Sequence, residues 1–344
     1  MELQIGADKE SLSGSSFLVT GGAGFIGSSL VAYLLNNGAG RVRVLDNFST
    51  GFRTNLEEFS SYPGFELIEG DIRDLQTCRE AAKGMRFVFH EAALGSVPRS
   101  IHDPVTTNEV NISGFLNMLV AARDEGVKRI VYAASSSTYG DSTELPKVED
   151  RIGRPLSPYA VTKYVNELYA DVFARTYGME LIGLRYFNVF GPKQNPAGAY
   201  AAVIPKFIEA LMNHESPVIN GDGEYSRDFT YIDNVIQMNM RAVFTDFAPA
   251  VNQTYNVAFG QQTSLNELTS YLKKYLCDYD PLIANVPIEY GQQRLGDIPH
   301  SLASIDKAQQ LLGYSPRFNV ETGLQETVRW FIKKKELATI HQAV

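Results

Sequence analysis

Over its first half, the chain alternates short apolar segments with longer segments of helical periodicity, and no other feature limits the possible fold as strongly. The apolar segments are rich in β-branched and aromatic residues, which is typical of strands buried on both faces of a sheet. Strands that alternate with helices at this spacing predict right-handed βαβ units around a parallel sheet. The expected strands are Ser16–Val19, Arg41–Leu45, Phe65–Glu69, Phe87–His90, Arg129–Ala134 and Leu181–Tyr186. The expected helices are Ile26–Leu35, Pro104–Arg123, Pro158–Tyr177 and Val203–Asn213.

The pattern changes after Tyr186. The next segment, residues 188–200, is interrupted by prolines and glycines and is expected to be an irregular loop. The last third of the chain lacks the βαβ rhythm. We therefore expect a large unit and a smaller, irregular α/β unit after an N-terminal extension. The first unit is expected to span residues 17–187, and residues 230–260 are expected to return to it. The second unit is expected to contain residues 188–229 and 261–344. The extension is residues 1–16.

The composition limits the class of protein. With 344 residues, of which 44% are hydrophobic and 20% charged, the chain is long enough for two globular domains. The formal net charge of −8 argues against binding to duplex DNA or to an anionic membrane surface, because both require a broad positive field. Two cysteines cannot build a disulfide framework, the five histidines lack the spacing of metal ligands, and residues 1–16 lack the apolar core of a secretory signal. We expect a cytoplasmic protein with no metal, no nucleic-acid partner and no membrane span.

A glycine-rich turn follows the first expected strand and precedes the first expected helix. Gly22, Gly24 and Gly27 fit the pattern G-x-G-x-x-G. Such glycines allow a tight turn, close approach of the backbone to a pyrophosphate and close packing of helix on strand, while the N–H groups of the helix N-terminus face the phosphates. The sequence therefore predicts a Rossmann-type doubly wound parallel sheet that binds a dinucleotide.

Asp46 indicates which dinucleotide is bound. It follows Gly27 by about 20 residues, at the end of the second expected strand. A carboxylate there can accept a hydrogen bond from a ribose 2′-hydroxyl and would repel a 2′-phosphate, which favours NAD over NADP; an ordinary turn or N-cap role is the alternative. Asp71 ends the third expected strand and is either a contact to the adenine edge or a turn residue. The residues expected to bind NAD are Gly21, Gly22, Gly24, Phe25, Ile26, Gly27, Asp46, Asn47, Ser49, Asp71, Ile72, Ala92, Tyr159 and Lys163.

A tyrosine and a lysine provide the candidate acid–base chemistry. Tyr159 and Lys163 are four residues apart, so a helix over 158–177 places them on one face. A free tyrosine has a pKa of ~10, and both a neighbouring ammonium and the positive charge of a nicotinamide favour its phenolate. The fifth expected strand delivers the hydroxyl-rich segment Ser135–Thr138 shortly before this helix. A hydroxyl at that strand end can bind the substrate oxygen that Tyr159 deprotonates.

Taken together, these motifs resemble those of the extended short-chain dehydrogenase/reductase family, in particular the UDP-hexose 4-epimerases. The similar segments cover nearly the whole chain and are TGGAGFIG, LDNFSTG, GDIRD, HEAA, SSSTYG, YAVTK, RYFNVFGP, SRDF and RLGD. Three of the longer segments, HEAALGSVPRS, SPYAVTKYVNELYADVFARTYG and INGDGEYSRDFTYIDNVIQ, are most similar to the branch that acts on UDP-N-acetylglucosamine and its uronic acid. The resemblance implies NAD as cofactor, a UDP-sugar as substrate, and reversible inversion at C4 through a transient 4-keto intermediate. It also implies a homodimer, because relatives pair helices equivalent to 104–123 and 158–177.

The resemblance further assigns roles to single residues. Tyr159 would be the catalytic base, Lys163 its ribose-binding partner, and Ser135 the hydroxyl that binds the reacting oxygen, with Ser136 and Ser137 supporting. The implied contacts are Asn188, Arg227 and Arg294 for the diphosphate, Asp297 for the uridine ribose, Ala202, Val203 and Asn220 for the uridine, and Ser96 and Arg99 for the hexose.

Two positions bear on the reaction and on the sugar. Sugar-nucleotide dehydratases and decarboxylases of this superfamily carry an acid where this chain has Ser137, and a serine cannot act as general acid or base for elimination. The resemblance places Ser301 against the hexose 2-substituent, where a bulky tyrosine would exclude an N-acetyl group, so its small side chain implies an N-acetylhexosamine; an ordinary loop serine is the alternative. The alternative functions are a UDP-glucose 4-epimerase, a UDP-sugar dehydrogenase or reductase with net redox change, and a non-catalytic NAD-binding sensor or scaffold.

Overall fold

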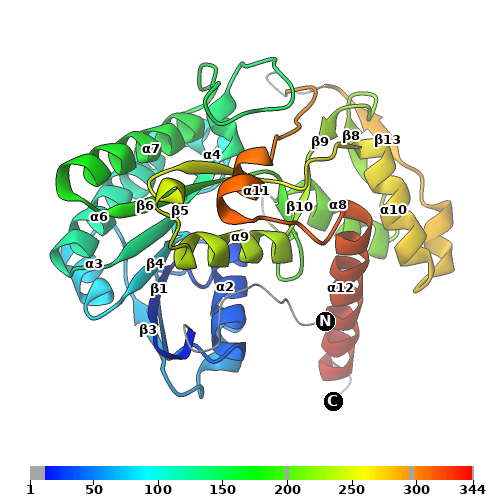
Figure 1. Cartoon of the computed structure of the whole chain (residues 1–344). Coiled ribbons are helices and arrows are strands. Elements are labelled where there is room, and N and C mark those ends of the chain that lie inside the picture. Colours follow the sequence, from blue (N-terminus) through cyan, green and yellow to red (C-terminus); the bar gives the residue numbers. More distant parts are fainter. Residues whose placement is uncertain (1–11, 198–200, 294–297, 343–344) are drawn as a thin grey trace.

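A seven-stranded parallel sheet forms the centre of the molecule, with the strand order β11-β6-β5-β4-β1-β2-β3 (Figure 1). The computed structural model describes residues 12–197, 201–293 and 298–342. The strands of this sheet are β1 Ser16–Thr20, β2 Arg41–Asp46, β3 Phe65–Glu69, β4 Phe87–His90, β5 Arg129–Ser135, β6 Glu180–Tyr186 and β11 Thr254–Val257. This architecture confirms the predicted doubly wound α/β class.

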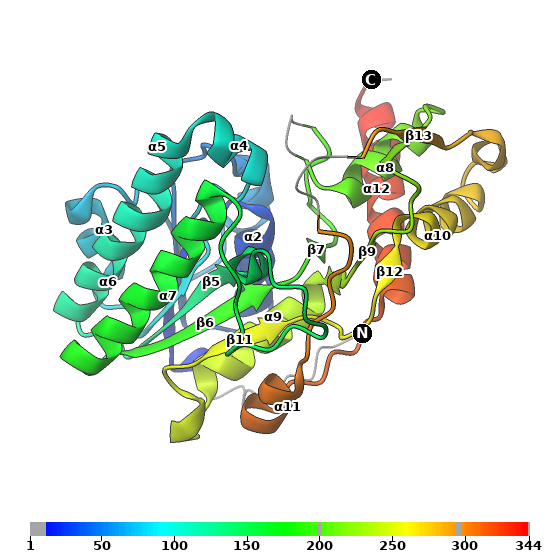
Figure 2. The same ribbon diagram turned by 90° about the horizontal axis from the view of Figure 1, so that it is seen from above.

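Helices cover both faces of the sheet (Figures 1 and 2). The α-helices are α2 Phe25–Asn36, α3 Leu75–Ala82, α4 Val97–His102, α5 Pro104–Asn108, α6 Gly114–Asp124, α7 Pro158–Tyr177, α8 Val203–Met212, α9 Ile232–Phe244, α10 Leu265–Cys277, α11 Asp306–Leu312 and α12 Val320–Gln342. Short 3-10 turns occupy Arg53–Asn55, Glu57–Phe59, Ser136–Tyr139, Ala248–Ala250 and Pro281–Asn285. Among these described helices, none is both apolar enough and long enough to cross a bilayer.

Alternate residues of each strand enter two separate cores, as a sheet covered on both faces requires. Phe17 and Val19 of β1 pack in the core that includes α2 and α9, whereas Leu18 packs in the core that includes α3, α6 and α7. All three side chains are fully buried. This arrangement explains why the strands are nearly continuous apolar runs in the sequence.

The predicted helix Pro104–Arg123 is continuous in direction but not in its hydrogen bonding. It begins as α5, passes through one π-helical turn at Glu109–Ser113, and continues as α6. The turn contains the buried Asn111, whose side chain accepts a hydrogen bond from Leu94 N at 2.8 Å and donates to Thr162 Oγ1 at 3.1 Å. Asn111 therefore ties the loop after β4 to helix α7.

The smaller, less regular part of the molecule lies beside the carboxyl ends of the large sheet (Figure 2). It contains α8 and α10 with short paired strands, and α12 packs against it. The short strands are β7 Val189–Phe190, β8 Val218–Asn220, β9 Ser226–Arg227, β10 Thr230–Tyr231, β12 Thr263–Ser264 and β13 Glu289–Gly291. β8 pairs in parallel with β13, β9 pairs antiparallel with β12, and β10 pairs in parallel with β7. Residues 254–257 return to the large sheet, because β11 pairs with β6.

Candidate active site

A cavity of about 500 Å³ opens at the carboxyl ends of the central strands. The strand order places β1 between β2 and β4, and ligands of open α/β sheets bind at such a switch point. The structure brings most of the predicted cofactor and catalytic residues to the wall of this cavity. The predicted residues that line it are Gly21, Gly24, Phe25, Ile26, Gly27, Asp46, Asn47, Ser49, Asp71, Ile72, Ala92, Ser135, Ser136, Tyr159, Lys163 and Asn188.

The glycine-rich turn forms a cradle at the N-terminus of α2. Gly21 has φ +69°, and a Cβ atom there would lie 2.7 Å from Ala92 N. A Cβ at Gly27 would lie 2.2 Å from Gly21 O, so only glycine allows the turn to pack against the helix. Gly24 faces the cavity and begins a helix of 12 residues without a side-chain cap. A negatively charged diphosphate fits this cradle, because the uncapped N–H groups and the helix dipole favour an anion there.

Gly22 differs from the other glycines of the turn. A Cβ atom at Gly22 would lie 2.7 Å from Val44 Cγ1 of β2, and Gly22 is not among the residues that line the cavity. Its absent side chain therefore serves the packing of the turn on the sheet. The predicted contact of Gly22 with the cofactor stays a prediction.

Asp46 connects the end of β2 to the glycine turn. One carboxylate oxygen accepts a hydrogen bond from Ala23 N at 2.8 Å, and the other accepts from Phe48 N at 2.8 Å. Burial raises the pKa of Asp46, and the two backbone hydrogen bonds lower it. Each carboxylate oxygen can accept more than one hydrogen bond, so Asp46 can hold the turn and still bind a ribose hydroxyl in the cavity.

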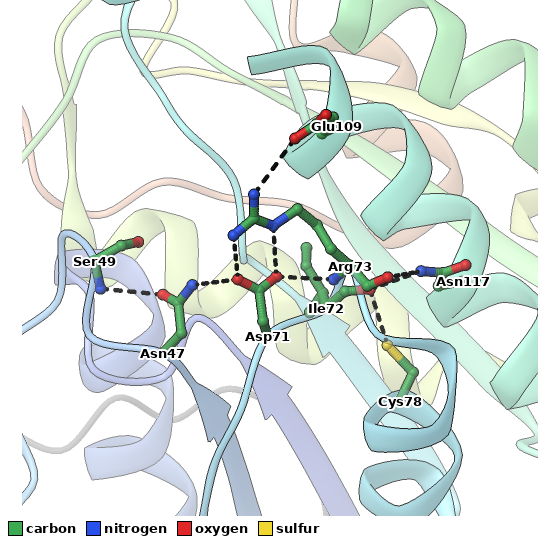
Figure 3. A network of polar contacts seen from close by, with 8 residues as sticks. All are labelled: Asn47, Ser49, Asp71, Ile72, Arg73, Cys78, Glu109 and Asn117. Atoms are coloured by element: carbon green, nitrogen blue, oxygen red, sulfur yellow. Dashed lines mark hydrogen bonds and ion pairs between the residues drawn. The ribbon is translucent and has the colours of Figure 1, made fainter. Parts of the chain in front are cut away.

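Asp71 and Asn47, which both line the cavity, belong to a network of polar contacts (Figure 3). The Asp71 carboxylate accepts from Arg73 Nη2 at 2.8 Å and from Asn47 Nδ2 at 2.8 Å, and Asn47 Oδ1 accepts from Ser49 N at 3.0 Å. The hydrogen bonds from Arg73, opposed by burial, lower the pKa of Asp71 to about 2. Arg73 also reaches Glu109, at 3.4 Å. Asp71 is thus ionised and firmly oriented; a contact with an adenine edge stays a prediction.

Helix α7 brings Tyr159 to the cavity in its first turn. Ser157 caps the helix by accepting from Ala160 N at 3.1 Å, and Ser100 Oγ of α4 accepts from Tyr159 N at 3.0 Å. The Tyr159 side chain interacts with the Ser135 side chain at the end of β5, and this interaction lowers the pKa of Tyr159. Ser137 supports this contact from behind, since its hydroxyl lies 2.9 Å from Ser135 Oγ. The predicted pair of hydroxyls is therefore together in the structure.

Lys163 lies one turn farther along α7 and is buried. Its ammonium donates to Ala133 O of β5 at 2.7 Å, and burial lowers its pKa to about 8. Burial raises the pKa of Tyr159, while the hydrogen bond with Ser135 lowers it. The balance is opposite to the expected lowering, because desolvation of the phenolate outweighs the other effects in the protein itself.

A second cavity, of about 590 Å³, adjoins the first on the side of the smaller unit. Asn188 lines both cavities, so it marks the place where they meet. Its backbone has φ +35°, which is unusual for a residue other than glycine, and its amide donates to Asp228 O at 3.2 Å. Backbone strain of this kind is common at ligand sites. The other predicted substrate residues in this cavity are Val203, Asn220 and Arg227.

The remaining predicted substrate residues within the described part of the chain do not line either cavity. Ser96 caps α4 by accepting from Arg99 N at 3.2 Å, Ala202 precedes α8, and Ser301 N donates to Ser226 O at 3.1 Å. Their contacts with a sugar nucleotide, like that of Ser137, stay predictions. Arg294 and Asp297 lie outside the described residues.

Sequence reasoning missed several residues that line the cavities. In the first cavity these include Glu91, Tyr186 and Gln194, and in the second Lys206, Phe207 and Tyr225. Glu91 and Tyr186 follow or end predicted strands, at positions that parallel sheets direct to the ligand site. Their position at the ends of predicted strands could have identified them from the sequence. In the second cavity, Lys206 and Phe207 lie on the predicted helix α8 and Tyr225 lies in an irregular segment, and neither position marks a ligand site in the sequence.

Comparisons with known proteins agree with this geometry. The family described as "NAD dependent epimerase/dehydratase family" matches residues 17–258. A putative UDP-glucose 4-epimerase of Methanocaldococcus jannaschii is 36% identical over 91% of this chain and 97% of its own. The solved structure of a UDP-N-acetylglucosamine 4-epimerase from Methanobrevibacter ruminantium, in complex with UDP-N-acetylmuramic acid, is 38% identical and superposes with a TM-score of 0.86 over 93% of this chain and 99% of that chain. A UDP-glucose 4-epimerase of Thermotoga maritima with UDP-glucose is 36% identical, with a TM-score of 0.85 over 93% and 99%.

Proposed function

The chain belongs to the NAD dependent epimerase/dehydratase family and uses NAD, and on that premise we propose that it reversibly inverts C4 of a UDP-N-acetylhexosamine. The observation that carries the proposal is that Tyr159 and Ser135, whose side chains interact, both line the wall of the cofactor cavity. The second cavity begins at Asn188 and contains Arg227, whose planar fork suits a diphosphate. The two cavities thus offer space for a dinucleotide and for a sugar nucleotide, with the Tyr159 phenol in the wall of the first.

In the proposed reaction, Tyr159 takes the proton of the 4′-hydroxyl and later returns it. Ser135 donates a hydrogen bond to the reacting oxygen while that oxygen becomes a carbonyl. NAD, when bound, supplies the acceptor and donor for the C4′ hydride, and its positive charge favours the Tyr159 phenolate that burial alone disfavours. Asn188 and Arg227 hold the diphosphate while the 4-keto sugar turns its other face. Since the hydride returns to the sugar, no net oxidation occurs.

Inversion is favoured over loss of water by the residues beside Tyr159. Ser137, in the position where dehydratases of this superfamily are expected to carry an acid, donates its hydroxyl to Ser135 or accepts from it at 2.9 Å. An aliphatic hydroxyl is too weak an acid to serve as the general acid that elimination needs. The 4-keto intermediate therefore returns to a hydroxyl.

The N-acetyl preference rests on Ser301 and on one relative. The segment with Ser301 lies along β9: Ser226 N donates to Pro299 O at 3.1 Å, and Arg227 Nη1 donates to the same oxygen at 3.1 Å. Ser301 is therefore fixed close to the guanidinium assigned to the diphosphate, near the expected sugar. The similarity to the M. ruminantium UDP-N-acetylglucosamine 4-epimerase supports this preference.

The test is to incubate the purified protein separately with UDP-N-acetylglucosamine, its uronic acid and UDP-glucose, without added NAD, and to read the configuration at C4 by NMR. We expect the 4-epimer of the N-acetylated sugar to accumulate to equilibrium over many turnovers. A dehydrogenase would stop after one hydride transfer per bound cofactor, and a sensor would convert nothing. Preference for UDP-glucose would replace the substrate but keep the reaction.

We also propose that the active form is a homodimer. Helices α6 and α7 lie side by side on one face of the molecule (Figure 2). On α7, Val161, Leu168 and Val172 expose 46%, 49% and 47% of their surface along one side of the helix. Val105 of α5 exposes 67% on the same face of the molecule. Pairing with a second copy would remove this apolar surface from water.

A further inference from the structure

Glu91 is a carboxyl group within the cofactor cavity that the proposed reaction does not use. It directly follows β4, and its backbone N–H donates to Thr20 O of β1 at 3.1 Å. Tyr159, Lys163 and Tyr186 line the same cavity. Glu91 thus stands at the carboxyl end of the central strand, on the side of the cavity that holds the acid–base residues.

The carboxyl group of Glu91 is held in place by a directed chain of hydrogen bonds. The Tyr186 hydroxyl donates to Glu91 Oε1 at 2.8 Å, and Asn239 Nδ2 of α9 lies 3.0 Å from that hydroxyl oxygen. Asn239 Nδ2 also donates to Val235 O at 2.9 Å, which orients the amide. The Tyr186 hydroxyl also lies 3.4 Å from Asn239 Oδ1, but its 2.8 Å contact with Glu91 is much shorter, so its single proton is directed to Glu91. The Tyr186 proton therefore has the Glu91 carboxyl oxygen as its acceptor.

The charged groups around Lys163 give Glu91 a particular importance. Glu167, on α7, also interacts with Lys163, but its two carboxylate oxygens accept from Arg185 at 2.9 and 2.7 Å. His90 of β4 is neutral, because burial and the nearby Lys163 lower its pKa to about 3. Among these neighbours in the described part of the chain, Glu91 is the carboxyl group with no cationic partner bound to it directly.

The electrostatic effects of Glu91 reach both members of the acid–base pair. Its negative charge raises the pKa of Lys163, in opposition to burial, and it also raises the pKa of Tyr159. Burial in turn raises the pKa of Glu91 to about 7, although Tyr186 and Lys163 lower it. Glu91 therefore changes charge in the pH range in which the pair has to work.

We propose that Glu91 is a positioning residue for catalysis: its carboxylate, held by Tyr186, stabilises the Lys163 ammonium and thereby sets the pH range in which Tyr159 acts as the base. This inference rests on the proposed epimerase function. A negative charge near a buried ammonium keeps it protonated, and the same charge disfavours a nearby phenolate. Glu91 thus moves both limbs of the pH profile to higher pH.

The test is the pH dependence of kcat for the NAD-bound enzyme and its Glu91→Gln variant, which keeps the acceptor oxygen for Tyr186 and removes the charge. Without the charge, the Tyr159 phenolate forms at lower pH and Lys163 loses its proton at lower pH. We expect both limbs of the Glu91→Gln profile to move to lower pH by about one pH unit. Glu91→Asp keeps the charge, so its profile should lie close to that of the wild type. The matched control is Glu80→Gln, which removes the same charge from a solvated helix surface where Glu80 accepts from Gln76; it should leave the profile in place.

A second readout does not depend on turnover. The ultraviolet absorbance of tyrosinate is followed against pH in each NAD-bound enzyme and in the same enzyme with Tyr159→Phe. The difference between the two curves reports the titration of Tyr159 alone. We expect the Tyr159 titration to move to lower pH in Glu91→Gln. If activity falls equally at every pH and the titration is unmoved, Glu91 is structural and the inference is overturned. If the wild type epimerises no UDP-sugar, the proposed function fails, while the titration still decides the role of Glu91.

If Glu91→Gln does not fold, the same measurements are made on Tyr186→Phe. That change removes the hydrogen bond that stabilises the carboxylate, so Glu91 is protonated more often and supports Lys163 less. Both limbs and the Tyr159 titration should again move to lower pH. Unmoved limbs in a folded Tyr186→Phe enzyme would overturn the inference.

Discussion

The Asp46 carboxylate accepts a 2.8 Å hydrogen bond from the backbone N–H of Ala23, so the end of β2 holds the glycine turn against the sheet. The same carboxylate lines the cavity at the N-terminus of α2. A single side chain thus holds the glycine turn and places a carboxylate in the wall of the cavity.

Substitution of Asp46 should separate these two effects. Asp46→Asn keeps an acceptor for one of the backbone hydrogen bonds and loses the charge, so discrimination against NADP should relax. Asp46→Ala loses both acceptors, and we expect its NAD affinity to fall by about tenfold or more, because hydrogen bonds to a charged group contribute about 1.5–3 kcal/mol. Calorimetric titration of each variant with NAD and NADP measures both effects. Unchanged affinity and selectivity in both would leave Asp46 as a turn residue.

Removal of the Tyr159 hydroxyl should abolish turnover while the protein stays folded. Tyr159→Phe leaves the ring and the backbone contact with Ser100 in place. We expect kcat to fall by about a thousandfold or more, in the range that acid–base catalysis contributes, with NAD and UDP binding retained. Tyr164→Phe is the matched control: it removes the same group from the same helix, at a residue that does not line either cavity. Undiminished turnover in Tyr159→Phe would contradict the assignment of the base.

The large sheet could be predicted because its strands carry local signals. Phe17, Leu18 and Val19 are apolar in succession, and both faces of β1 are buried. β11 lacked such a signal, because its four residues include Asn256. This side chain is fully buried, accepts from Tyr139 Oη at 2.7 Å, and donates to Lys147 O at 2.9 Å. Partners 48 to 117 positions away satisfy its amide, and no local pattern reveals them.

The candidate site also contains residues that local sequence spacing predicts and residues that depend on distant contacts. The glycine turn, Asp46, Tyr159 and Lys163 follow from spacing within one or two adjacent elements. Glu91 depends on Tyr186 and through it on Asn239, which belong to three separate elements that meet only in the folded protein. Sequence spacing also could not give the direction of the Tyr159 pKa shift, because desolvation depends on the complete cavity wall.

Asp228 should make stability depend on pH. It is fully buried, accepts from Phe259 N at 3.0 Å and Ala303 N at 3.2 Å, and burial raises its pKa from 3.8 to about 7. The folded protein thus retains a proton that the unfolded chain releases near pH 3.8. Stability from this group is full below that pH and is lost as the pH rises toward about 7.

The neutral variant Asp228→Asn should therefore lose less stability than the wild type between about pH 5 and about pH 8. We expect the difference in the free energy of unfolding between the two proteins to change by roughly 2–3 kcal/mol over this range, in favour of the variant at high pH. Urea unfolding at several pH values measures it. Asp222→Asn, in an exposed loop where Asp222 accepts from Glu224 N, is the control and should follow the wild type. A difference that does not change with pH would show that Asp228 does not titrate in this range.

A charge on α7 should disrupt the proposed dimer. Leu168→Glu places a carboxylate on the apolar face, and burying it against a second copy is unfavourable. We expect the variant to sediment as a monomer at concentrations at which the wild type is dimeric. Leu282→Glu is the matched control, because Leu282 exposes 63% of its surface near α10, in the smaller unit. A wild type that is monomeric at all concentrations would refute the dimer.

The size of residue 301 should decide which sugars are accepted. Ser301 is half-buried, and its backbone N–H donates to Ser226 O at 3.1 Å, so a larger side chain cannot move away with its backbone. Ser301→Tyr should reduce kcat/KM for UDP-N-acetylglucosamine by about a hundredfold while UDP-glucose is still converted, because a clash with the N-acetyl group affects only the larger sugar. Ser301→Ala removes only the hydroxyl and should convert both sugars at nearly the wild-type ratio. Parallel rate measurements with the two sugars give the ratio for each variant. An equal loss with both sugars in Ser301→Tyr would place residue 301 outside the contact with the 2-substituent.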